Sequence, residues 1–471
     1  MKILLTGATG YIGKRLLPLL LDQGHEVICC VRDKNRFYYP ERGSKNIQVI
    51  EVDFLEPKSV DKIPDDVDAA YYLIHSMSGA SNYDELESIS ANYFKNKISK
   101  TSAKQVIYLS GIVNDESLSK HLSSRKAVEE ILKTAATPTT TLRAGIIVGS
   151  GSASFEIIRD LIHKLPVMIT PRWLNTKCQP IAISDVLEFL MRSLLNPKTY
   201  DESFDVGGPD ILTYKEMLLQ FAEAKKLKRH IYTLPVMTPK LSSYWLYFIT
   251  STSFKLAAAL VSSMKVEVVC SDTRINDVLD VKPISYRLAL QRALIKIDED
   301  AVASSWKDSQ ISGQFKGSVS YYLKVPKKDC FIDRRKRKIV DRDFTIDKIW
   351  SIGGETGWYY ADWLWSLRGF IDKIFGGVGA RRGRTHKHDL HAGDVLDFWR
   401  VVHADKDQGK LILYAEMKLP GEAWLEFKIL NNTLYLAATF KPKGIWGKLY
   451  WYSVLPFHGF IFNGMINRLI G

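Results

Sequence analysis

Three glycines near the N-terminus have the spacing of a turn that holds a diphosphate. In the segment ILLTGATGYIGKRLL, Gly7, Gly10 and Gly13 separate an apolar strand-like run from a helix-like run. The first glycine of such a turn permits the tight bend, the second lets the backbone approach the phosphates, and the third lets the helix pack closely. The phosphates then meet free N–H groups at a helix start. The predicted dinucleotide contacts are Thr6, Gly7, Gly10, Tyr11, Ile12 and Gly13.

Charged residues after the second apolar run indicate which dinucleotide would bind. The segment VICCVRDKNR carries Arg32 and Asp33 directly after the apolar residues, with Lys34 and Arg36 close by. An acidic residue here would bind the ribose hydroxyls of NAD, whereas a cation accommodates the extra phosphate of NADP. The planar fork of arginine suits phosphate. We therefore favour NADP(H), with NAD(H) as the alternative that Asp33 would serve.

The elements that must position these residues alternate between strand and helix as far as about residue 221. Alternation of this kind predicts βαβ units, and hence a Rossmann-like, doubly wound parallel α/β sheet with helices on both faces. The predicted strands are Ile3–Thr6, Val27–Val31, Ile47–Val52, Ala69–Ile74, Val106–Ser110 and Thr141–Val148. The helix-length segments between them include Ile12–Gln23, Tyr83–Thr101 and Ser123–Thr134.

Three of these features together resemble the short-chain dehydrogenase/reductase superfamily, and more closely its atypical, NmrA-like branch. They are TGATGYIG at Thr6–Gly13, Arg32 after the second strand, and VDF at Val52–Phe54. The resemblance covers about residues 1–224, where FDVGGPDILTYKEML looks like that group's substrate-side segment. It implies that Asp53, with its neighbour Phe54, lies near the adenine.

The same resemblance places a loop and a catalytic group. Leu73–Ser76, which includes Ile74 and His75, would follow the nicotinamide side of the cofactor. Active reductases of the superfamily carry a Tyr and a Lys four residues apart on a helix, with a Ser at the end of the preceding strand. Ser110 occupies the serine position, but the other two positions hold His121 and Arg125.

The pair His121 and Arg125 is open to three interpretations. Their spacing puts both side chains on one helix face. His121 could donate a proton, because an imidazole titrates close to neutral pH, while Arg125 holds the cofactor as a permanent cation. Alternatively, the pair binds the cofactor without catalysis, or it has a purely structural role.

The C-terminal part differs in composition and in the order of its elements. It holds eight of the 11 tryptophans. Strands near Lys338–Phe344, at Asp394–Val402, Lys410–Leu419, Ala423–Leu430 and Thr433–Phe440, helices through Ile346–Phe375 and a last helix at Trp446–Ile470 predict an α+β module. It looks like an uncharacterised domain that follows such nucleotide-binding domains in bacteria. Its order is similar to the START/polyketide-cyclase helix-grip fold, whose last helix closes a pocket over a curved sheet.

An aromatic stretch in this part indicates either a core helix or a pocket wall. Trp358, Trp363 and Trp365 lie between two Gly pairs. Ordinary core preference favours buried aromatics. The functional alternative is the wall of a pocket for a small apolar molecule, with Arg368 or Glu355 as its polar contact.

Length and composition predict a folded protein of two or three domains. The chain has 471 residues, of which 46% are hydrophobic and 25% charged. We expect a domain at residues 1–300, a connector at 301–328 and a second domain at 329–471. The net charge of +13 would suit phosphate-bearing ligands, nucleic acid or an anionic membrane. We expect no nucleic-acid partner, because the basic run Asp333–Val340 has no stacking platform or groove-binding element beside it.

Other signals concern metals and location. The five cysteines lack metal-ligand spacing, and His386, His388 and His391 look like a polar loop, so no metal site is expected. No leader precedes the first strand, which predicts a cytoplasmic protein. The apolar segment Leu241–Met264 is expected to form buried helices; the alternative is peripheral contact with the inner face of the membrane, through this segment or the aromatic tail Trp446–Ile461.

These observations lead to two functional hypotheses. The first is an oxidoreductase that uses NADP(H) on an apolar carbonyl, enone or quinone-like compound, although the usual Tyr/Lys pair is missing. The alternative is a non-catalytic NAD(P)H-responsive sensor or scaffold, in which the C-terminal domain binds an apolar ligand.

Overall fold

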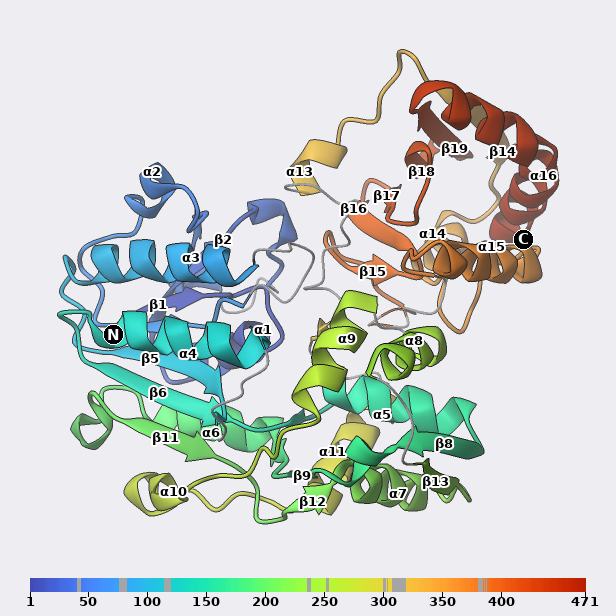
Figure 1. The fold of residues 1–471 in the computed structure, drawn as a ribbon. Coiled ribbons are helices and arrows are strands. Elements are labelled where there is room, and N and C mark those ends of the chain that lie inside the picture. The colour runs from blue at the N-terminus through green and yellow to red at the C-terminus, as the bar shows by residue number, and fades with distance from the viewer. Residues whose placement is uncertain are drawn as a thin grey trace. The chain divides into compact units, whose positions relative to one another are not determined.

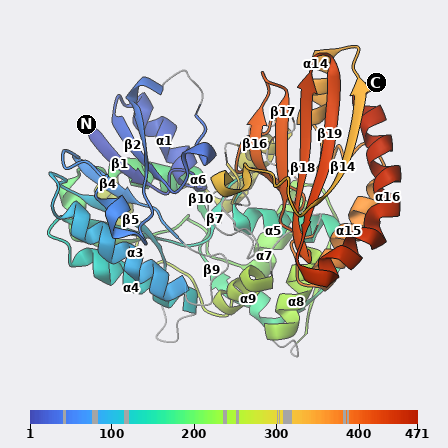
Figure 2. The same ribbon diagram turned by 90° about the horizontal axis from the view of Figure 1, so that it is seen from above.

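The computed structural model of the protein divides into two compact units (Figure 1, Figure 2). The first unit is Met1–Lys34 with Tyr39–Gln310, and the second is Asn35–Tyr38 with Ile311–Gly471. The division therefore falls inside the expected connector 301–328. The structure describes residues 1–39, 44–75, 83–113, 120–234, 239–250, 254–299, 302, 304–306, 319–379, 384, 386 and 388–471.

The first unit contains a seven-stranded parallel sheet, as the alternation of strands and helices predicted. Its strand order is β11-β6-β5-β4-β1-β2-β3, and Leu4 of the inner strand β1 pairs with Ile28 on one side and Ala70 on the other. Ile3, Leu4 and Leu5 have no exposed surface, because helices cover both faces. The strands are β1 (Lys2–Thr6), β2 (Glu26–Val31), β3 (Ile47–Glu51), β4 (Ala69–Tyr72), β5 (Val106–Gly111), β6 (Thr139–Ala144) and β11 (Ser203–Val206).

Two helix layers sandwich this sheet. Helices α1 (Gly13–Asp22) and α6 (Ile183–Arg192) contact each other on one face, and α3 (Tyr83–Ile98) and α4 (Lys120–Lys133) do so on the other (Figure 1, Figure 2). Phe94 is buried among the side chains on the α3–α4 side of the sheet. The doubly wound α/β architecture is thus confirmed. Short elements complete the layers: α2 (Pro57–Val60) and the 3-10 turns η1 (Lys34–Arg36), η2 (Ser44–Asn46) and η4 (Pro197–Thr199).

Beyond the carboxyl ends of the strands, a largely helical subdomain has its own core.

The chain enters this subdomain after β6. The prediction of one strand over Thr141–Val148 was wrong, because the chain leaves the main sheet after Ala144 and pairs Ile147–Val148 with Ile181–Ala182. The elements are β7 (Ile147–Val148), α5 (Ala153–Lys164), β8 (Val167–Pro171), η3 (Arg172–Asn175), β9 (Lys177–Cys178), β10 (Ile181–Ala182), β12 (Leu212–Thr213), α7 (Tyr214–Ala224), β13 (His230–Leu234), α8 (Pro239–Ile249), α9 (Phe254–Ser263), α10 (Arg274–Leu279) and α11 (Tyr286–Asp298).

The apolar segment 241–264 lies in this subdomain as the two helices α8 and α9. Leu246, Ala257 and Val261 are at most 2% exposed and pack in the subdomain core. Tyr244 and Phe248 of α8 are 43% and 39% exposed, so the described part of the segment forms helices that are buried on one side only. No helix among the described residues has both the length and the apolar composition needed to cross a bilayer.

The second unit is built on a six-stranded antiparallel sheet, in the order β14-β19-β18-β17-β16-β15. The long helix α16 packs along β14 and β19 (Figure 2). The expected α+β module is thus confirmed. Its elements are α13 (Val319–Tyr322), β14 (Phe331–Lys338), α14 (Arg342–Trp350), α15 (Asp362–Ile374), β15 (Val395–Leu396), β16 (Trp399–Asp405), β17 (Lys410–Ala415), β18 (Gly421–Leu430), β19 (Thr433–Pro442) and α16 (Gly444–Ile470).

Two elements of this unit differ from their predictions. The single strand expected at Asp394–Val402 is instead the hairpin of β15 and β16, and another strand is shifted along the chain. The strand expected near Lys338–Phe344 ends at Lys338 and occupies the basic run before it. The side chain of Asp341 accepts a hydrogen bond from the backbone N–H of Phe344 and so caps α14 at that point. Because this cap satisfies a free N–H of the first helical turn, the chain becomes helical from Arg342 onward.

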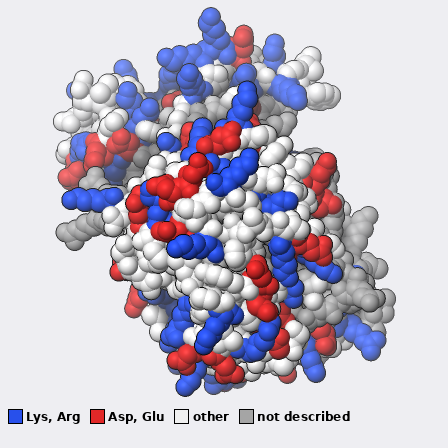
Figure 3. Space-filling model, turned by 90° about the vertical axis from the view of Figure 1, so that its left-hand side faces the viewer, with Lys and Arg blue, Asp and Glu red and all other residues white. Residues whose placement is uncertain are grey.

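Charge on the molecular surface is mixed over the face shown in Figure 3. Lys and Arg side chains there are interspersed with Asp and Glu. A phosphate backbone is bound by clustered cations. The described residues on this face therefore offer no continuous basic track.

A buried ion pair in the second unit predicts a measurable loss of stability. Arg400 and Glu416 are each 1% exposed, and the Arg400 Nε donates to the Glu416 Oε1 at 2.6 Å. Arg400→Met leaves a buried carboxylate without its cation, so we expect a loss of about 3–5 kcal/mol in the free energy of unfolding. Urea denaturation of the full chain measures it.

The control for this experiment is an exposed ion pair in the same sheet. Lys441 lies 4.0 Å from Glu422, and the two side chains are 50% and 35% exposed. Lys441→Met should cost less than about 1 kcal/mol. Equal losses for the two variants would contradict the assignment of a stabilising buried pair.

Candidate functional site

The glycine turn after β1 has no room for side chains. Gly7 has φ +66°, and a Cβ there would lie 2.5 Å from the carbonyl oxygen of Leu73. A Cβ on Gly13 would lie 2.3 Å from the carbonyl oxygen of Gly7, which accepts a hydrogen bond from the Gly10 N–H at 2.8 Å. Ile12 occupies the N-cap position of α1, but its side chain has no acceptor for the free backbone N–H groups of the first turn. The bare backbone and the uncapped helix start fit a diphosphate.

The residues that flank the glycines brace the turn. The Thr6 hydroxyl donates to the carbonyl of Tyr71 and accepts from the Leu73 N–H, both at 3.0 Å, so it ties β1 to the end of β4. The Tyr11 hydroxyl donates to the Ser150 carbonyl at 3.3 Å. Burial raises the pKa of Tyr11 to about 12, so the phenol stays protonated at neutral pH.

Arg15 and Ser304 support Tyr11 from behind the turn, and the sequence pattern did not predict these contacts. The Arg15 guanidinium lies over the Tyr11 ring, donates to the Ser150 carbonyl at 2.7 Å and to the Ser304 hydroxyl at 2.9 Å. The Ser304 hydroxyl in turn donates to the Tyr11 carbonyl at 3.0 Å. Because Ser304 lies almost 300 residues away along the chain, sequence spacing could not reveal this contact.

At the end of β2, the arginine is accessible and the neighbouring acid is buried. Arg32 is exposed, whereas Asp33 is 3% exposed. The backbone N–H of Lys34 donates to the Glu51 carboxylate at 3.0 Å. Arg32 and Lys34 are therefore the accessible cations at the end of this strand, whereas the carboxylate of Asp33 is not accessible.

The residues predicted near the adenine and the nicotinamide lie after β3 and β4. Asp53 is half-buried and accepts from the Leu55 N–H at 3.0 Å, whereas Phe54 is 5% exposed and packs in the core. Ile74 and His75 are half-buried, and the His75 Nε2 lies 3.0 Å from the Leu109 carbonyl oxygen. Ser76 lies outside the described residues.

Two of the three predicted catalytic side chains, Ser110 and Arg125, lie near the carboxyl end of β5. Ser110 is 1% exposed, and its hydroxyl lies beside that of Tyr108 two residues earlier on the same strand. On α4, the Nε of Arg125 is buried without a described partner, and its Nη1 lies 3.3 Å from where a Cβ on Gly111 would be. His121 lies one turn earlier on α4, and its side chain falls outside the described residues.

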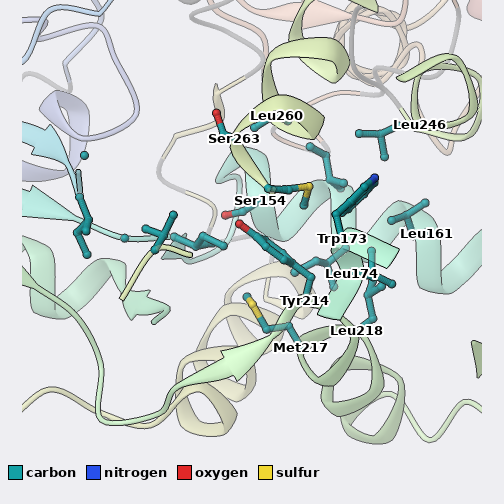
Figure 4. Close-up of a pocket in the computed structure, with 18 of the residues that line it drawn as sticks. Ser154, Leu161, Trp173, Leu174, Tyr214, Met217, Leu218, Leu246, Leu260 and Ser263 are labelled. Atoms are coloured by element: carbon teal, nitrogen blue, oxygen red, sulfur yellow. The ribbon is translucent and has the colours of Figure 1, made fainter. Parts of the chain in front are cut away.

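An apolar pocket of about 190 Å³ lies beyond β5 and β6 (Figure 4). Gly111 and Gly145 form its strand side, and Arg125 contributes a charged group to its lining. The Trp173 Nε1 is buried without a partner among the described residues. The other walls come from α5, α7, α8 and α9 and include Leu161, Tyr214, Met217, Leu218, Leu246 and Leu260. The pocket is suited to a small apolar molecule with an oxygen that accepts hydrogen bonds.

The second unit has a larger cavity, of about 500 Å³, between its sheet, α15 and α16. Four of its lining side chains have a buried nitrogen without a partner among the described residues: Trp365 Nε1, Arg368 Nε, Trp399 Nε1 and His458 Nδ1. Burial lowers the pKa of His458, so its ring is neutral near pH 7. The lining of this cavity is apolar and rich in aromatic side chains, with polar groups that could hold a ligand oxygen.

The aromatic stretch thus has both of the roles considered for it. Trp358 is 3% exposed, stacks on Trp365 and donates from its Nε1 to the Asp397 carboxylate at 3.0 Å, so it belongs to the core. Trp365 and Arg368 line the cavity, whereas Glu355 is exposed and does not. No group of three metal-ligating side chains occurs among the residues that the structure describes.

Two parts of the chain match known protein families. Residues 3–103 match the NAD dependent epimerase/dehydratase family. The N-terminal domain is of this NAD(P)-binding type. Residues 327–465 match a family described as protein of unknown function (DUF2867). The second unit therefore contains an uncharacterised domain.

Two curated relatives resemble the N-terminal half. The 40 kDa subunit of mitochondrial NADH-ubiquinone oxidoreductase from Neurospora crassa is 25% identical over 234 residues, which are 48% of this chain. The match spans only 60% of that subunit's length. Photosystem II assembly factor Ycf39 from Guillardia theta is 24% identical over 276 residues, which are 57% of this chain and 85% of the factor.

Solved structures share the N-terminal fold. Triphenylmethane reductase from Citrobacter sp. matches with a TM-score of 0.52 and 17% identity, covering 63% of this chain and all of that one. The same reductase in complex with NADP(H) matches with a TM-score of 0.51 and 16% identity, over 62% of this chain and all of that one. A nucleoside-diphosphate-sugar epimerase from Staphylococcus aureus matches with a TM-score of 0.50 and 15% identity, over 62% of this chain and all of that one.

Because Gly7 lies so close to the backbone of Leu73, adding one methyl group at Gly7 should disturb the turn and weaken cofactor binding. Gly7→Ala would put a Cβ 2.5 Å from a backbone oxygen that cannot move aside. We expect NADPH affinity, measured by calorimetry, to fall at least tenfold.

The matched control is Gly24→Ala at the other end of α1. Gly24 also has a positive φ, of +77°, but no atom lies within 4 Å of its would-be Cβ. This variant should lose about 1–2 kcal/mol of stability from backbone strain and keep its NADPH affinity. Unchanged binding in Gly7→Ala would argue against the turn as the diphosphate site.

Proposed function

We propose that the protein is an NADP(H)-dependent reductase of small apolar compounds that carry a carbonyl, enone or quinone group. The observation that carries the proposal is the apolar pocket beyond β5 and β6, with Arg125 in its wall and the buried Ser110 at the adjacent strand end. Ligands of open α/β sheets bind outside the carboxyl ends of the strands, which is where this pocket lies. Hydrogen-bond donors in an apolar pocket select a substrate oxygen.

The charges at the end of β2 support the phosphorylated cofactor. Arg32 is exposed there, while Asp33 is almost fully buried. A guanidinium can form two parallel hydrogen bonds with a phosphate. We therefore assign Arg32 to the 2′-phosphate of NADP(H), with the glycine turn holding the diphosphate.

NADP(H), held by the glycine turn and Arg32, would supply the hydride for an electrophilic carbon of a substrate in the apolar pocket. The Ser110 hydroxyl donates a hydrogen bond to the substrate oxygen, and Arg125 stabilises the negative charge that develops on it. His121 delivers the proton that completes the alcohol, enol or hydroquinone. One hydride and one proton are thereby added, and the oxidised dinucleotide leaves.

The second candidate function is a sensor or scaffold without turnover. The cavity of the second unit favours it, because four nitrogens that lack a partner among the described residues lie in an apolar lining and would hold an apolar ligand with an acceptor oxygen. The long helix α16 against the antiparallel sheet also supports the helix-grip-like interpretation of this unit. In this alternative, the dinucleotide changes the state of the protein without being consumed.

Turnover separates the two functions. We expect the full chain to oxidise NADPH, followed by absorbance at 340 nm, with a member of a panel of quinones and enones. Arg125→Met and Ser110→Ala should each lower kcat/KM by about 10²–10³-fold, because each removes a group that stabilises developing charge. His121→Phe should lower kcat while leaving NADPH affinity nearly unchanged.

The control variant is Lys126→Met, which removes an exposed cation at the next position of α4. It should keep its activity. Stabilisation of the protein by NADPH with no consumption across the panel would instead favour the sensor.

Cofactor choice provides a separate test. Arg32→Ser should weaken NADPH binding by at least tenfold, because the 2′-phosphate loses its cation, and should leave NADH binding within twofold. The NADH titration of the same variant is the internal control. An equal loss for both dinucleotides would contradict the assignment of Arg32 to the phosphate.

A further inference from the structure

Helix α15 of the second unit has its apolar side exposed. Its buried side includes Asp372 and Lys373, which are 1% and 4% exposed. A surface helix of a globular protein normally has the reverse arrangement. The exposed apolar residues recur every three or four positions and so form one stripe, and their exposed fractions range from 39% to 69%: Trp363, Leu367, Phe370, Ile371, Ile374 and, just after the helix, Phe375.

The first two-thirds of α16 also exposes apolar side chains. Trp446 is 74% exposed and Tyr452 is 61% exposed. The sequence of α16 contains no acidic residue, and Lys441, Lys443 and Lys448 are exposed at its N-terminal end. The exposed apolar residues of this part are Ile445, Trp446, Leu449, Tyr452, Leu455, Phe457 and Phe460.

The two sets of exposed residues meet at the cavity of the second unit. Trp363, Leu367 and Ile371 of α15 line that cavity and are also exposed, and so is Phe457 of α16. These four side chains therefore lie at its opening. We call the exposed apolar residues of α15, Phe375 and α16 together the apolar face.

We propose that the apolar face docks on an anionic lipid bilayer. Exposed aromatic and aliphatic side chains flanked by lysines are typical of helices that lie in a membrane interface. The basic charge is concentrated in this part of the chain, because residues 311–471 carry 26 Lys and Arg against 16 Asp and Glu. Anionic headgroups attract such a segment electrostatically. None of the described helices can cross a bilayer, so the contact is a peripheral one.

The position of the cavity opening has a consequence for its ligand. When the apolar face is in the bilayer, a hydrophobic molecule can move between the membrane and the cavity without passing through water. The unpaired nitrogens of Trp365, Arg368 and Trp399 would then hold its polar end. This docking does not depend on the proposed reductase activity, and its test does not require turnover.

Vesicle co-sedimentation of the full chain tests the proposal. The probes are sucrose-loaded vesicles of phosphatidylcholine, alone or mixed with phosphatidylglycerol. We expect the protein to pellet with the mixed vesicles and much less with the neutral ones. Lys443→Glu/Lys448→Glu should lower the pelleted fraction on the mixed vesicles severalfold, and so should high salt.

Substitutions within the apolar face identify the contact. Phe370→Glu/Phe375→Glu should lower the partition coefficient at least tenfold, because carboxylates do not enter the interface. Val340→Glu/Tyr321→Glu is the matched control, since these residues of the same unit are 98% and 72% exposed and lie outside the face. The control should change partitioning by less than twofold. Trp446→Ser/Leu449→Ser is a second variant that adds no charge and should also lower partitioning.

Three results would overturn the proposal. The first is a wild-type protein that pellets with neither type of vesicle. The second is equal partitioning of the apolar-face variants and the Val340→Glu/Tyr321→Glu control. The third is a wild-type dimer in light scattering that the apolar-face variants convert to monomer, because the face would then bind a second copy of the chain.

Discussion

The close approach of two backbone segments at the end of β1 sets the geometry on which the N-terminal unit depends. With no Cβ at Gly7 and Gly13, the turn can lie against the carbonyl of Leu73 and fold back on itself before α1 begins. The hydroxyl of Thr6 holds the ends of β1 and β4 together at the same level. The helix start, the end of β2 and the ends of β5 and β6 therefore face one region beyond the sheet.

The two cavities differ in volume but share one property, a buried polar group in an apolar wall. Each has apolar walls that include polar groups left without described partners, Arg125 in the smaller and Trp365, Arg368 and Trp399 in the larger. A buried donor without an acceptor costs free energy in the empty protein. A ligand that brings an oxygen to such a donor removes that cost, so both cavities favour molecules with an apolar body and an acceptor group.

The local sequence pattern predicted most helices and strands. It did not predict the contacts between residues that are far apart in the chain. The glycine spacing and the alternating runs identified the parallel sheet, because both depend on neighbouring residues. The bracing of Tyr11 by Arg15 and Ser304 could not be predicted, since it joins distant parts of the chain. Composition indicated aromatic residues in the C-terminal part, but it could not separate the buried Trp365 from the exposed Trp363, because the orientation of α15 decides which of its faces is buried.

The buried carboxylate of Asp372 opposes rotation of α15 about its own axis. It accepts hydrogen bonds from the backbone N–H groups of Gly379 and Lys418, at 2.9 and 2.7 Å. Turning the helix about its axis to hide Phe370 would pull this carboxylate away from both donors and leave them unsatisfied. The helix is thus locked in a single rotational setting. The apolar side chains of α15 therefore stay exposed to solvent when no membrane or partner covers them.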